Sequence, residues 1–476
     1  MSQIKTIFKN MSWLLISQII ASICGFIWTI LIARYLGVTE YGVLGFAISF
    51  TVILSMPLDF GISTHIVRHI ATDNDSASKY LGNAIPLKSI FAAFTLVLSL
   101  IILILMKYDE LTITVTLLFT IETILKSMMG LINGTFMAFE NGKYQGITNT
   151  IMNVLLFIFI LISIFTDLGI YGISISYVIS NLIALSYAYV KLNNNLAKPK
   201  FEIDKNFCKM ITLASIPFAI TGVFYTIYYS IDVVMITNMV GNYATGIYNA
   251  SYKLISVLTL FYSVYSAVIY PVMSKLFKND EKLLIMSFEK SIKYLMMIMI
   301  PLAVATVFYS TDIIQLIYGH EYDAANTVLS ILIWTVCLIF VNGSCTTLLN
   351  ASYHEKSVTI IYVIAAIFNV VLNLYMIPHY SYDGAAISTV LSDLLILIVS
   401  LIMIKKIDKL PNIKLAWDLG KIILGSLVLG IALYYLKLNM WVAIPIGIVI
   451  YFGTITLLKG FDNEDKYVIR EILGKN

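Results

Sequence analysis

Long apolar runs recur along the whole chain, separated by short polar segments. Each run is long enough, as a helix rising about 1.5 Å per residue, to cross a hydrocarbon core of about 30 Å. The pattern predicts an all-α polytopic membrane protein with about fourteen transmembrane helices. The predicted spans are 11–33, 42–62, 83–106, 112–138, 145–166, 170–190, 210–238, 244–272, 292–310, 326–350, 357–377, 383–404, 418–436 and 440–458.

Positive charge is unevenly distributed between the two sets of connecting segments. With the N-terminus on the cytoplasmic side, 25 of the 31 lysine and arginine residues fall in inner segments, and only Arg34, Lys107 and Lys437 fall outside. Lysine and arginine are retained on the cytoplasmic side of a membrane. We therefore expect both termini to be cytoplasmic and the protein to lie in the plasma (inner) membrane. The net charge of +4 follows from this topology and gives no reason to expect nucleic acid as a partner.

Composition supports the same class. Hydrophobic residues make up 59% of the chain and charged residues 12%, with a mean hydropathy of +0.89, whereas a soluble domain has roughly 25% charged residues. The first apolar run is too long for the core of a signal peptide, so we expect it to remain as the first span. The loops are too short for an extramembrane catalytic domain, so we do not expect an enzyme. The four cysteines show neither metal-ligand nor disulfide spacing.

The two halves of the chain resemble each other. YLGVTEYGVLGFAIS, starting at Tyr35, aligns with MVGNYATGIYNASYK, starting at Met239, and LGIYGISISYVISNL, starting at Leu168, aligns with YSYDGAAISTVLSDL, starting at Tyr380. Six spans per half is an even number, so the two repeats are expected to run parallel, with substrate between them near the midplane. The predicted parts are an N-terminal six-helix lobe, a cytoplasmic linker, a C-terminal six-helix lobe, and two additional helices with a tail, at 1–192, 193–208, 209–404 and 405–476.

Four charged residues lie deep inside predicted spans. Asp232 and Lys253 are each roughly 14 Å from the turn that joins their helices, and Glu122 and Lys126 lie about 15 and 21 Å down the fourth span. A lone charge at this depth costs at least about 2.5 kcal/mol, so such residues face a bundle interior or a wet cavity. The repeat aligns all four with uncharged residues, which favours a functional role. Two structural alternatives stay open: an i,i+4 pair of Glu122 with Lys126, and an interhelical pair of Asp232 with Lys253.

Polar and aromatic residues surround Asp232 and Lys253 in sequence. Tyr225, Tyr229 and Asp232 follow an i, i+4, i+7 pattern, which places them on one side of a helix. A tyrosine offers a flat apolar face and a hydroxyl, which suits a sugar ring, although packing or interfacial anchoring is the commoner role of any single tyrosine. Asn249 lies one turn before Lys253 and could share its face.

Two further cations occupy unusual positions. Arg34 lies at the outer end of the first span, where it either extends to lipid headgroups or binds a phosphate through its guanidinium fork. Lys88 lies about six residues into the third span, in the inner half. The histidines sit in loops or at helix ends, without the spacing of a metal site.

Four stretches carry a family resemblance: ARYLGVTEYGVLGFAISF, LDFGISTHIVRHIA, IDVVMITNMVGNYATGIYNASYKL and LNLYMIPHYSYDGAAISTVLSD. They resemble the polysaccharide transporters, the O-antigen type flippases of the multidrug/oligosaccharidyl-lipid/polysaccharide superfamily. The resemblance implies two six-helix lobes in a V around a central cationic cavity, with two C-terminal helices added. It also implies transfer of polyprenyl-diphosphate-linked oligosaccharide from the cytoplasmic to the outer leaflet by alternating access. Asp232, Lys253, Arg34 and Asp59 match charged positions of the family.

From these residues and this resemblance we predict two sets of functional residues. The substrate-binding set is Lys253, Arg34, Lys126, Lys88, Tyr225, Tyr229 and Asn249. The coupling or gating set is Asp232, Glu122 and Asp59. A proton or Na⁺ is the expected coupling ion, with no bound cofactor and no metal site.

Two other functions stay open. A cation-coupled multidrug exporter of the same superfamily would share the lobes but usually has twelve helices. A membrane glycan polymerase should carry a long outer loop with catalytic residues, which the chain lacks. The expected partners are the lipid-linked oligosaccharide and membrane lipids, followed by a polysaccharide polymerase and glycosyltransferases.

Overall fold

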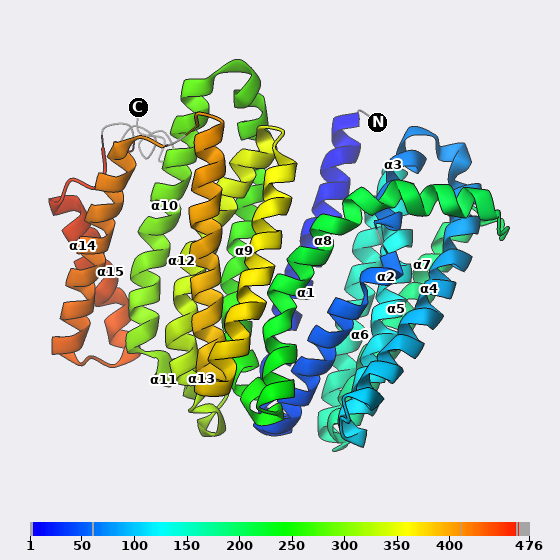
Figure 1. The fold of residues 1–476 in the computed structure, drawn as a ribbon, viewed down its shortest axis with the longest axis horizontal. Helices are drawn as coiled ribbons and strands as arrows, with labels where there is room; N and C mark the ends of the chain where they lie inside the picture. The colour runs from blue at the N-terminus through cyan, green and yellow to red at the C-terminus, as the bar shows by residue number, and fades with distance from the viewer. Residues whose placement is uncertain (1–2, 60, 410, 463–464, 466–476) are drawn as a thin grey trace. The chain divides into compact units, whose positions relative to one another are not determined.

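The computed structural model describes residues 3–59, 61–409, 411–462 and 465, except for the side chains of 3–9 and 213–221. Helices form all the regular structure of these residues (Figure 1). Their bounds are α1 Gln3–Leu54, α2 Met56–Asp59, α3 Ile62–Thr72, α4 Ala77–Leu105, α5 Glu110–Ala138, α6 Gly142–Phe165, α7 Gly169–Asn195, α8 Lys205–Met239, α9 Asn242–Asn279, α10 Glu281–Phe308, α11 Ser310–Ile317, α12 Ala325–Ala351, α13 Glu355–Lys406, α14 Ile413–Leu436 and α15 Met440–Leu457, with short 3₁₀ turns η1 Asn74–Ser76 and η2 His320–Tyr322.

Eleven helices of the described residues are long and apolar enough to span a membrane. Two of them, α1 and α13, run through predicted turns, but each contains a residue with non-helical backbone there: Gly37 (φ 70°) and Ser381 (φ 53°). The breaks confirm the two predicted turns. The prediction of a multi-pass all-helical membrane protein is confirmed, while the count of fourteen stays a prediction.

The prediction of one continuous span over 42–62 is wrong at its end. α1 stops at Leu54, and the chain continues as the short helix α2 and then α3. Pro57 lacks a backbone N–H and is tolerated in the first turn of α2 but not in a helix interior. Gly61 has a left-handed conformation (φ 74°) before α3, which favours glycine. The break places Asp59 at the end of a four-residue helix rather than inside a span.

The chain forms two compact units, Met1–Gly246 and Ile247–Asn476, called unit 1 and unit 2. The boundary falls inside α9, close to its start. The predicted lobes rest on the sequence repeat and on a polar linker, whereas the two units are defined by how densely their residues contact one another. The division at 192 and 208 therefore stays a prediction about the repeat.

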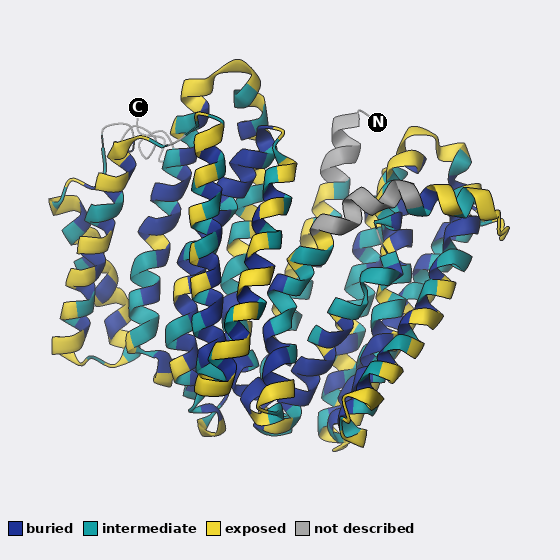
Figure 2. Cartoon of the chain, viewed as in Figure 1, coloured by how far each residue is buried: buried dark blue, intermediate teal, exposed yellow. Residues whose placement is uncertain are grey.

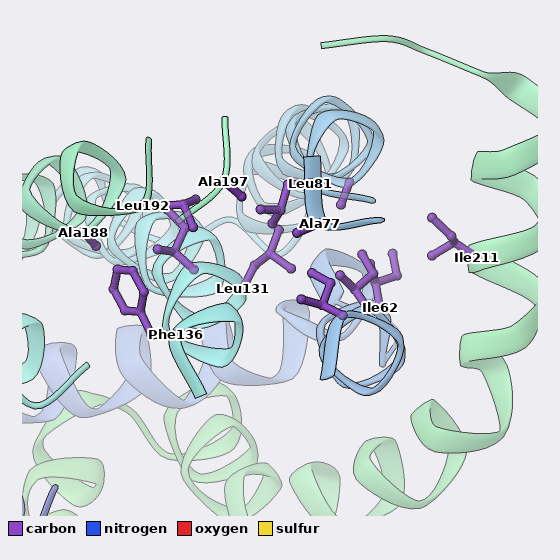
Figure 3. Close-up of a cluster of buried hydrophobic side chains, with 13 residues drawn as sticks. Ile62, Ala77, Leu81, Leu131, Phe136, Ala188, Leu192, Ala197 and Ile211 are labelled. Atoms are coloured by element: carbon purple, nitrogen blue, oxygen red, sulfur yellow. The ribbon is translucent and has the colours of Figure 1, made fainter. Parts of the chain in front are cut away.

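In unit 1, a core of buried apolar side chains joins α3, α4, α5, α7 and the start of α8 (Figure 3). Helix α3 contributes Ile62, Ile66 and Ile70, which are fully buried and spaced by four residues. This spacing is the apolar stripe of an amphipathic helix, so α3 packs one face into the core and leaves the other face polar. Ile211 of α8 packs into the same core.

In unit 2, burial is greatest in α12 and much lower in the last two helices (Figure 2). In their most apolar windows, 61% of the residues of α12 are buried, against 33% in α14 and 22% in α15. Helix α12 packs between α10 and α13, whereas α14 packs on α10 and α15 packs on α14. The last two helices are thus an addition to one side of α10.

Candidate functional site

The i,i+4 pair predicted in α5 is present. Nζ of Lys126 lies 2.6 Å from Oε1 of Glu122. The side chain of Glu122 is 4% exposed and that of Lys126 is 50% exposed. From α7, the amide of Asn181 donates to the same Oε1 at 3.3 Å, and the hydroxyl of Thr123 donates to Oε2 at 3.4 Å. The carboxylate is therefore buried and held by several donors, while the ammonium group that it pairs with reaches the surface of unit 1.

The face of α5 around Lys126 makes few packing contacts with other helices. Gly130, one turn further along, is exposed, and a Cβ placed on it would meet no atom within 4 Å. A face turned to lipid would normally carry bulky apolar side chains, whereas a lysine beside a bare glycine leaves room for a polar ligand or water. Lys126 is thus an accessible cation with a buried counter-ion.

A second ion pair in unit 1 joins Lys88 of α4 to Asp59 of α2. Nζ of Lys88 lies 2.5 Å from Oδ1 of Asp59, 3.0 Å from Oγ of Ser63 and 3.0 Å from the backbone oxygen of Ser127. Lys88 is 1% exposed, whereas Asp59 is 38% exposed. An ammonium group has three donors, and these three acceptors occupy all of them. Lys88 can bind a ligand only if this pair opens.

The tyrosines predicted beside Asp232 do gather on α8. The ring centroids of Tyr225 and Tyr229 are 4.6 Å apart, and Tyr228 makes an edge contact with Tyr229 at 5.1 Å. Tyr225 is 46% exposed, while Asp232 and Tyr228 are buried. The cluster therefore presents one accessible aromatic ring on the helix that also carries the buried Asp232, while a shared binding role for these residues stays a prediction.

The remaining predicted residues are placed as follows. Arg34 is exposed on α1 before the break at Gly37. Lys253 is exposed and Asn249 is half-buried on α9, in unit 2. Asp232 belongs to unit 1, so its pairing with Lys253 stays a prediction.

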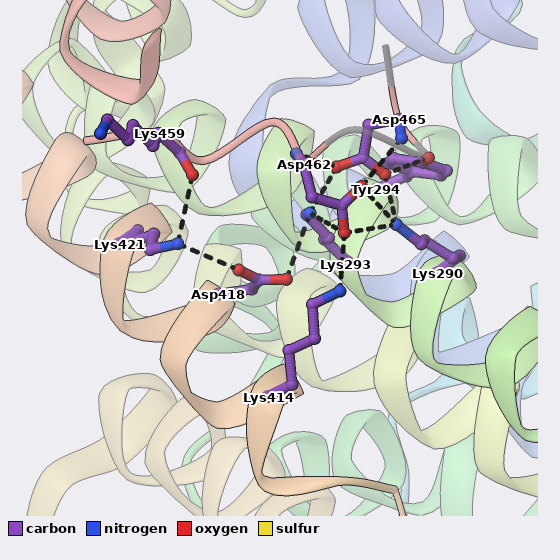
Figure 4. A network of polar contacts seen from close by, with 9 residues as sticks. All are labelled: Lys290, Lys293, Tyr294, Lys414, Asp418, Lys421, Lys459, Asp462 and Asp465. Carbon is purple, nitrogen blue, oxygen red and sulfur yellow. Dashed lines mark hydrogen bonds and ion pairs between the residues drawn. The ribbon is translucent and has the colours of Figure 1, made fainter. Parts of the chain in front are cut away.

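Unit 2 contains a set of charged residues that sequence reasoning missed (Figure 4). They come from α10, from α14 and from the segment after α15, and we call them the C-terminal charge network: Lys290, Lys293, Tyr294, Lys414, Asp418, Lys421, Asp462 and Asp465. Lys293 is 2% exposed and binds Asp465 at 2.5 Å and Asp418 at 3.1 Å. Lys290 binds Asp465 at 2.6 Å and Asp462 at 2.9 Å.

The two aspartates after α15 cap each other. The backbone N–H of Asp462 donates to Oδ2 of Asp465 at 2.9 Å, and the N–H of Asp465 donates to Oδ1 of Asp462 at 2.8 Å. This reciprocal i,i+3 arrangement is that of a capping box. Burial opposes ionisation of both carboxyls, but the hydrogen bonds from Lys290, Lys293 and Lys414 outweigh it and hold the pKa of Asp462 and of Asp465 below the usual range.

The network lies on a cavity of about 670 Å³ between α10 and α14, whose charged lining includes Lys282, Glu289 and Asp418. The predicted span starts at residue 292, which puts Lys290 just before it and Lys293 at its first residues, near the membrane surface. α10 begins at Glu281 instead, so both lysines lie inside the helix. The acidic stretch FDNED after the last span was the available signal for their partners.

No group of three or more histidine, cysteine, aspartate or glutamate side chains suited to a metal ion occurs among the described residues. The polar chemistry of both units, as far as the structure describes them, is that of ion pairs and hydrogen bonds in apolar surroundings.

Comparisons with known proteins agree with this picture. The family model described as "polysaccharide biosynthesis protein" matches residues 7–277, and the MatE model matches residues 217–375. The chain is 25% identical over 406 residues to the capsular polysaccharide biosynthesis protein CapF of Staphylococcus aureus, covering 82% of this chain and 97% of the relative. It is 23% identical over 470 residues to the probable low-salt glycan biosynthesis flippase Agl15 of Haloferax volcanii, covering 94% of both chains.

Two solved structures have a similar fold. The lipid II flippase MurJ, in an inward closed conformation, matches with a TM-score of 0.79 at 18% identity, over 93% of this chain and 98% of that one. An inward-facing multidrug resistance MATE family transporter of the MOP superfamily matches with a TM-score of 0.68 at 13% identity, over 82% and 96%. At these identities the likeness concerns the fold.

Proposed function

The chain belongs to the polysaccharide biosynthesis protein family, and on this premise we propose that it is a flippase for polyprenyl-diphosphate-linked oligosaccharide. It is a multi-pass membrane transporter of the MOP superfamily. The proposed direction of transfer is from the cytoplasmic to the outer leaflet of the plasma membrane, by alternating access, with both termini in the cytoplasm.

The observation that carries the proposal is the pair of Lys126 with Glu122 in unit 1. A glycan head group cannot cross hydrocarbon, since each unpaired hydroxyl costs several kcal/mol to desolvate. A diphosphate adds negative charge that needs a cation on the same path. Lys126 is half-exposed and its ammonium group is held by a buried carboxylate, so it can turn toward a phosphate while Glu122 keeps its hydrogen bonds from Asn181 and Thr123.

The other residues take roles within the same proposal. Arg34 and Lys253, both exposed, serve as further phosphate contacts, and Tyr225 with Tyr229 and Asn249 would contact the sugar rings. Asp232, Glu122 and Asp59 are the candidates for binding a coupling proton or Na⁺. The membrane potential supplies about 2.3 kcal/mol per charge per 100 mV, which is enough to bias one gating step.

Reconstitution in liposomes tests the proposal. A fluorescent polyprenyl-diphosphate oligosaccharide is followed between leaflets with wild-type protein and with Lys126→Gln, Lys253→Ala and Asp232→Asn. Lys107→Gln removes one exposed charge from the connection between α4 and α5 and serves as the matched control. Transfer by wild type and by the control that is lost in Lys126→Gln supports the proposal, and no transfer of any lipid-linked glycan by wild type contradicts it.

A cation-coupled multidrug exporter is the second candidate, favoured by the MatE match over residues 217–375. Efflux of cationic dyes from the same liposomes, without glycan transfer, would establish it. A polysaccharide polymerase and glycosyltransferases are the proposed partners of the flippase.

A further inference from the structure

The segment that connects α7 to α8 has an unusual surface. Residues 197–210, called the connecting segment, comprise a non-helical stretch and the first turns of α8. Its two most exposed large apolar side chains are Phe201 at 59% and Ile203 at 63%. The segment also carries four exposed lysines, Lys198, Lys200, Lys205 and Lys209.

The backbone of the connecting segment is fastened to the start of α4. The N–H of Lys200 donates to the backbone oxygen of Ser78 at 3.2 Å, and the N–H of Asp204 donates to Oδ1 of Asn83 at 2.9 Å. Between these bonds the chain passes directly over Gly82, where a Cβ would lie 1.7 Å from the backbone oxygen of Lys200. The segment is therefore held in one place on unit 1.

The start of α4 lies at the level of lipid headgroups. α4 has 29 residues, about 44 Å of helix, which exceeds a hydrocarbon core of about 30 Å. Its polar residues Ser78, Lys79 and Asn83 are in the first two turns, whereas residues 90–105 carry no charge. The excess length is thus at the start of the helix, where the connecting segment is bound.

The apolar and polar side chains of the segment separate by position. The exposed apolar residues Phe201 and Ile203 alternate in sequence with the exposed charged residues Lys200 and Glu202, an order that separates the two kinds to opposite sides wherever a backbone is extended. The carboxylate of Asp204 accepts the N–H groups of Asn206 and Phe207 at the start of α8. One of the two acidic residues is therefore engaged in capping, and the segment keeps a surplus of positive charge.

Neighbouring residues extend this positive surface. Nζ of Lys79 in α4 lies 4.8 Å from the ring centroid of Phe207. Arg68 is an exposed residue of α3, whose buried face packs in the same core as Phe207. Lysines beside exposed aromatic and aliphatic side chains, at the end of a spanning helix, are the combination that binds anionic lipid surfaces.

We propose that the connecting segment binds the phosphate headgroups of anionic membrane lipids, with Phe201 and Ile203 inserted at the boundary between headgroups and acyl chains. The lysines attract the anionic leaflet, and the fixed attachment to α4 sets the depth. This contact anchors the chain between α7 and α8 whatever glycan the protein carries.

Fluorescence quenching at two neighbouring positions tests the proposal. Ile203→Cys and Glu202→Cys are each labelled with an environment-sensitive dye in full-length protein whose half-buried Cys24 and Cys208 are replaced by alanine; Cys337 and Cys345 are buried. The labelled protein is placed in nanodiscs of phosphatidylcholine containing a shallow spin-labelled lipid, with or without about 30% phosphatidylglycerol. We expect at least threefold stronger quenching at position 203 than at position 202 when phosphatidylglycerol is present.

Charge removal separates this contact from apolar packing. Replacing all four lysines of the segment by glutamine, or adding about 0.5 M salt, should lower quenching at position 203 at least twofold. The matched control replaces four exposed lysines of unit 2 by glutamine, Lys275, Lys278, Lys282 and Lys356, and should change nothing. Equal quenching at both positions overturns the proposal. So does quenching at position 203 that stays the same without phosphatidylglycerol and after replacement of the four lysines. Glycan transfer, measured separately in liposomes, does not enter this readout.

Discussion

Lys126 in unit 1 and Lys293 in unit 2 are both lysines of spanning helices that bind carboxylates, yet their surroundings are opposite. Lys126 is 50% exposed and pairs with Glu122 on its own helix. Lys293 is 2% exposed and lies between Asp418 of α14 and Asp465 after α15. The first ammonium group can exchange its partner at the surface, whereas the second joins three parts of the chain and cannot leave without exposing buried charge.

The difference indicates which charged residues of a membrane protein can bind a ligand and which ones stabilise the fold. A buried ion pair adds little net stability while both partners remain. Removing one partner, however, destabilises the protein by several kcal/mol, because the other charge stays buried without compensation. A half-exposed pair contributes little to stability in either case. We therefore assign the C-terminal charge network to holding α14 and α15 on α10, whereas the accessible cation of the α5 pair is the one that suits the proposed transport function.

The largest expected effect follows from Asp465→Asn. The change leaves Lys290 and Lys293 with one carboxylate fewer in a buried site, which should destabilise unit 2 by about 3 kcal/mol. The apparent unfolding temperature should fall by about 6–12 °C, measured with a thiol-reactive dye that reports exposure of the buried Cys337 and Cys345. Asp312→Asn removes an exposed carboxylate of α11 and should leave the temperature unchanged. An equal fall in both variants would contradict the assigned role.

Acidification should act on the same network. The folded-state pKa values of Asp462 and Asp465 are lowered, so their contribution to stability is complete above the unfolded value of about 3.9 and is lost as pH falls through the lower folded values. Each unit of lowering corresponds to about 1.4 kcal/mol. Unfolding temperatures measured from pH 7 down to pH 3 should fall less steeply in a double variant, Asp462→Asn with Asp465→Asn, than in wild type. If the unfolding temperature fell equally with pH in the double variant and in wild type, the network would not be the cause of the acid destabilisation.

A smaller effect, and one on a different property, is expected for Lys126→Gln. Transfer of lipid-linked oligosaccharide between leaflets should slow at least tenfold, or about 1.4 kcal/mol, because the accessible cation is lost. The unfolding temperature should stay close to that of wild type, because Lys126 is half-exposed and the buried Glu122 keeps the hydrogen bonds from Asn181 and Thr123. Lys126→Arg keeps the charge and should retain most of the transfer rate. Full activity of Lys126→Gln would mean that Lys126 has no part in transport.

The smallest stability change is expected for Glu122→Gln. The side-chain oxygen of the new glutamine can still accept the hydrogen bond from Asn181, and the ammonium group of Lys126 can turn to water. The loss of stability should therefore stay below about 1 kcal/mol. Measuring both this variant and Asp465→Asn by tryptophan fluorescence, to which the buried Trp28 of unit 1 contributes, sharpens the contrast between the two sites. A loss of 3 kcal/mol in Glu122→Gln would show that the α5 pair is as structural as the network.

Much of the fold was predictable because it follows from local pattern. Runs of apolar residues specify helices wherever water is excluded, and the turns at Gly37 and Ser381 lie where polar residues interrupt those runs. The pair of Glu122 with Lys126 was predictable for the same reason, since residues four apart on a helix are neighbours. The early end of the second span was missed, although Pro57 and Gly61 signalled it.

Local sequence pattern could not predict the pairing of Lys88 with Asp59 or the contacts of the C-terminal charge network. Asp59 and Lys88 are 29 positions apart and Lys290 and Asp465 are 175 apart, so no helical period relates them. Their contacts depend on which helices pack together and in which rotation. A charged residue in an apolar run predicts that a partner exists, but the choice of partner is made by packing.

The sequence by itself determined that this protein spans a membrane many times as helices, because the cost of placing unpaired backbone polar groups in lipid leaves no alternative for such apolar runs. It also determined the local pair in α5 and the resemblance to polysaccharide transporters. Only the tertiary structure decided that Lys88 is enclosed by three acceptors, that Asp462 and Asp465 fasten the last helices to α10, and that the segment between α7 and α8 is bound over Gly82. These contacts join parts of the chain that are distant in sequence, and distance in sequence carries no information about proximity until the helices have packed.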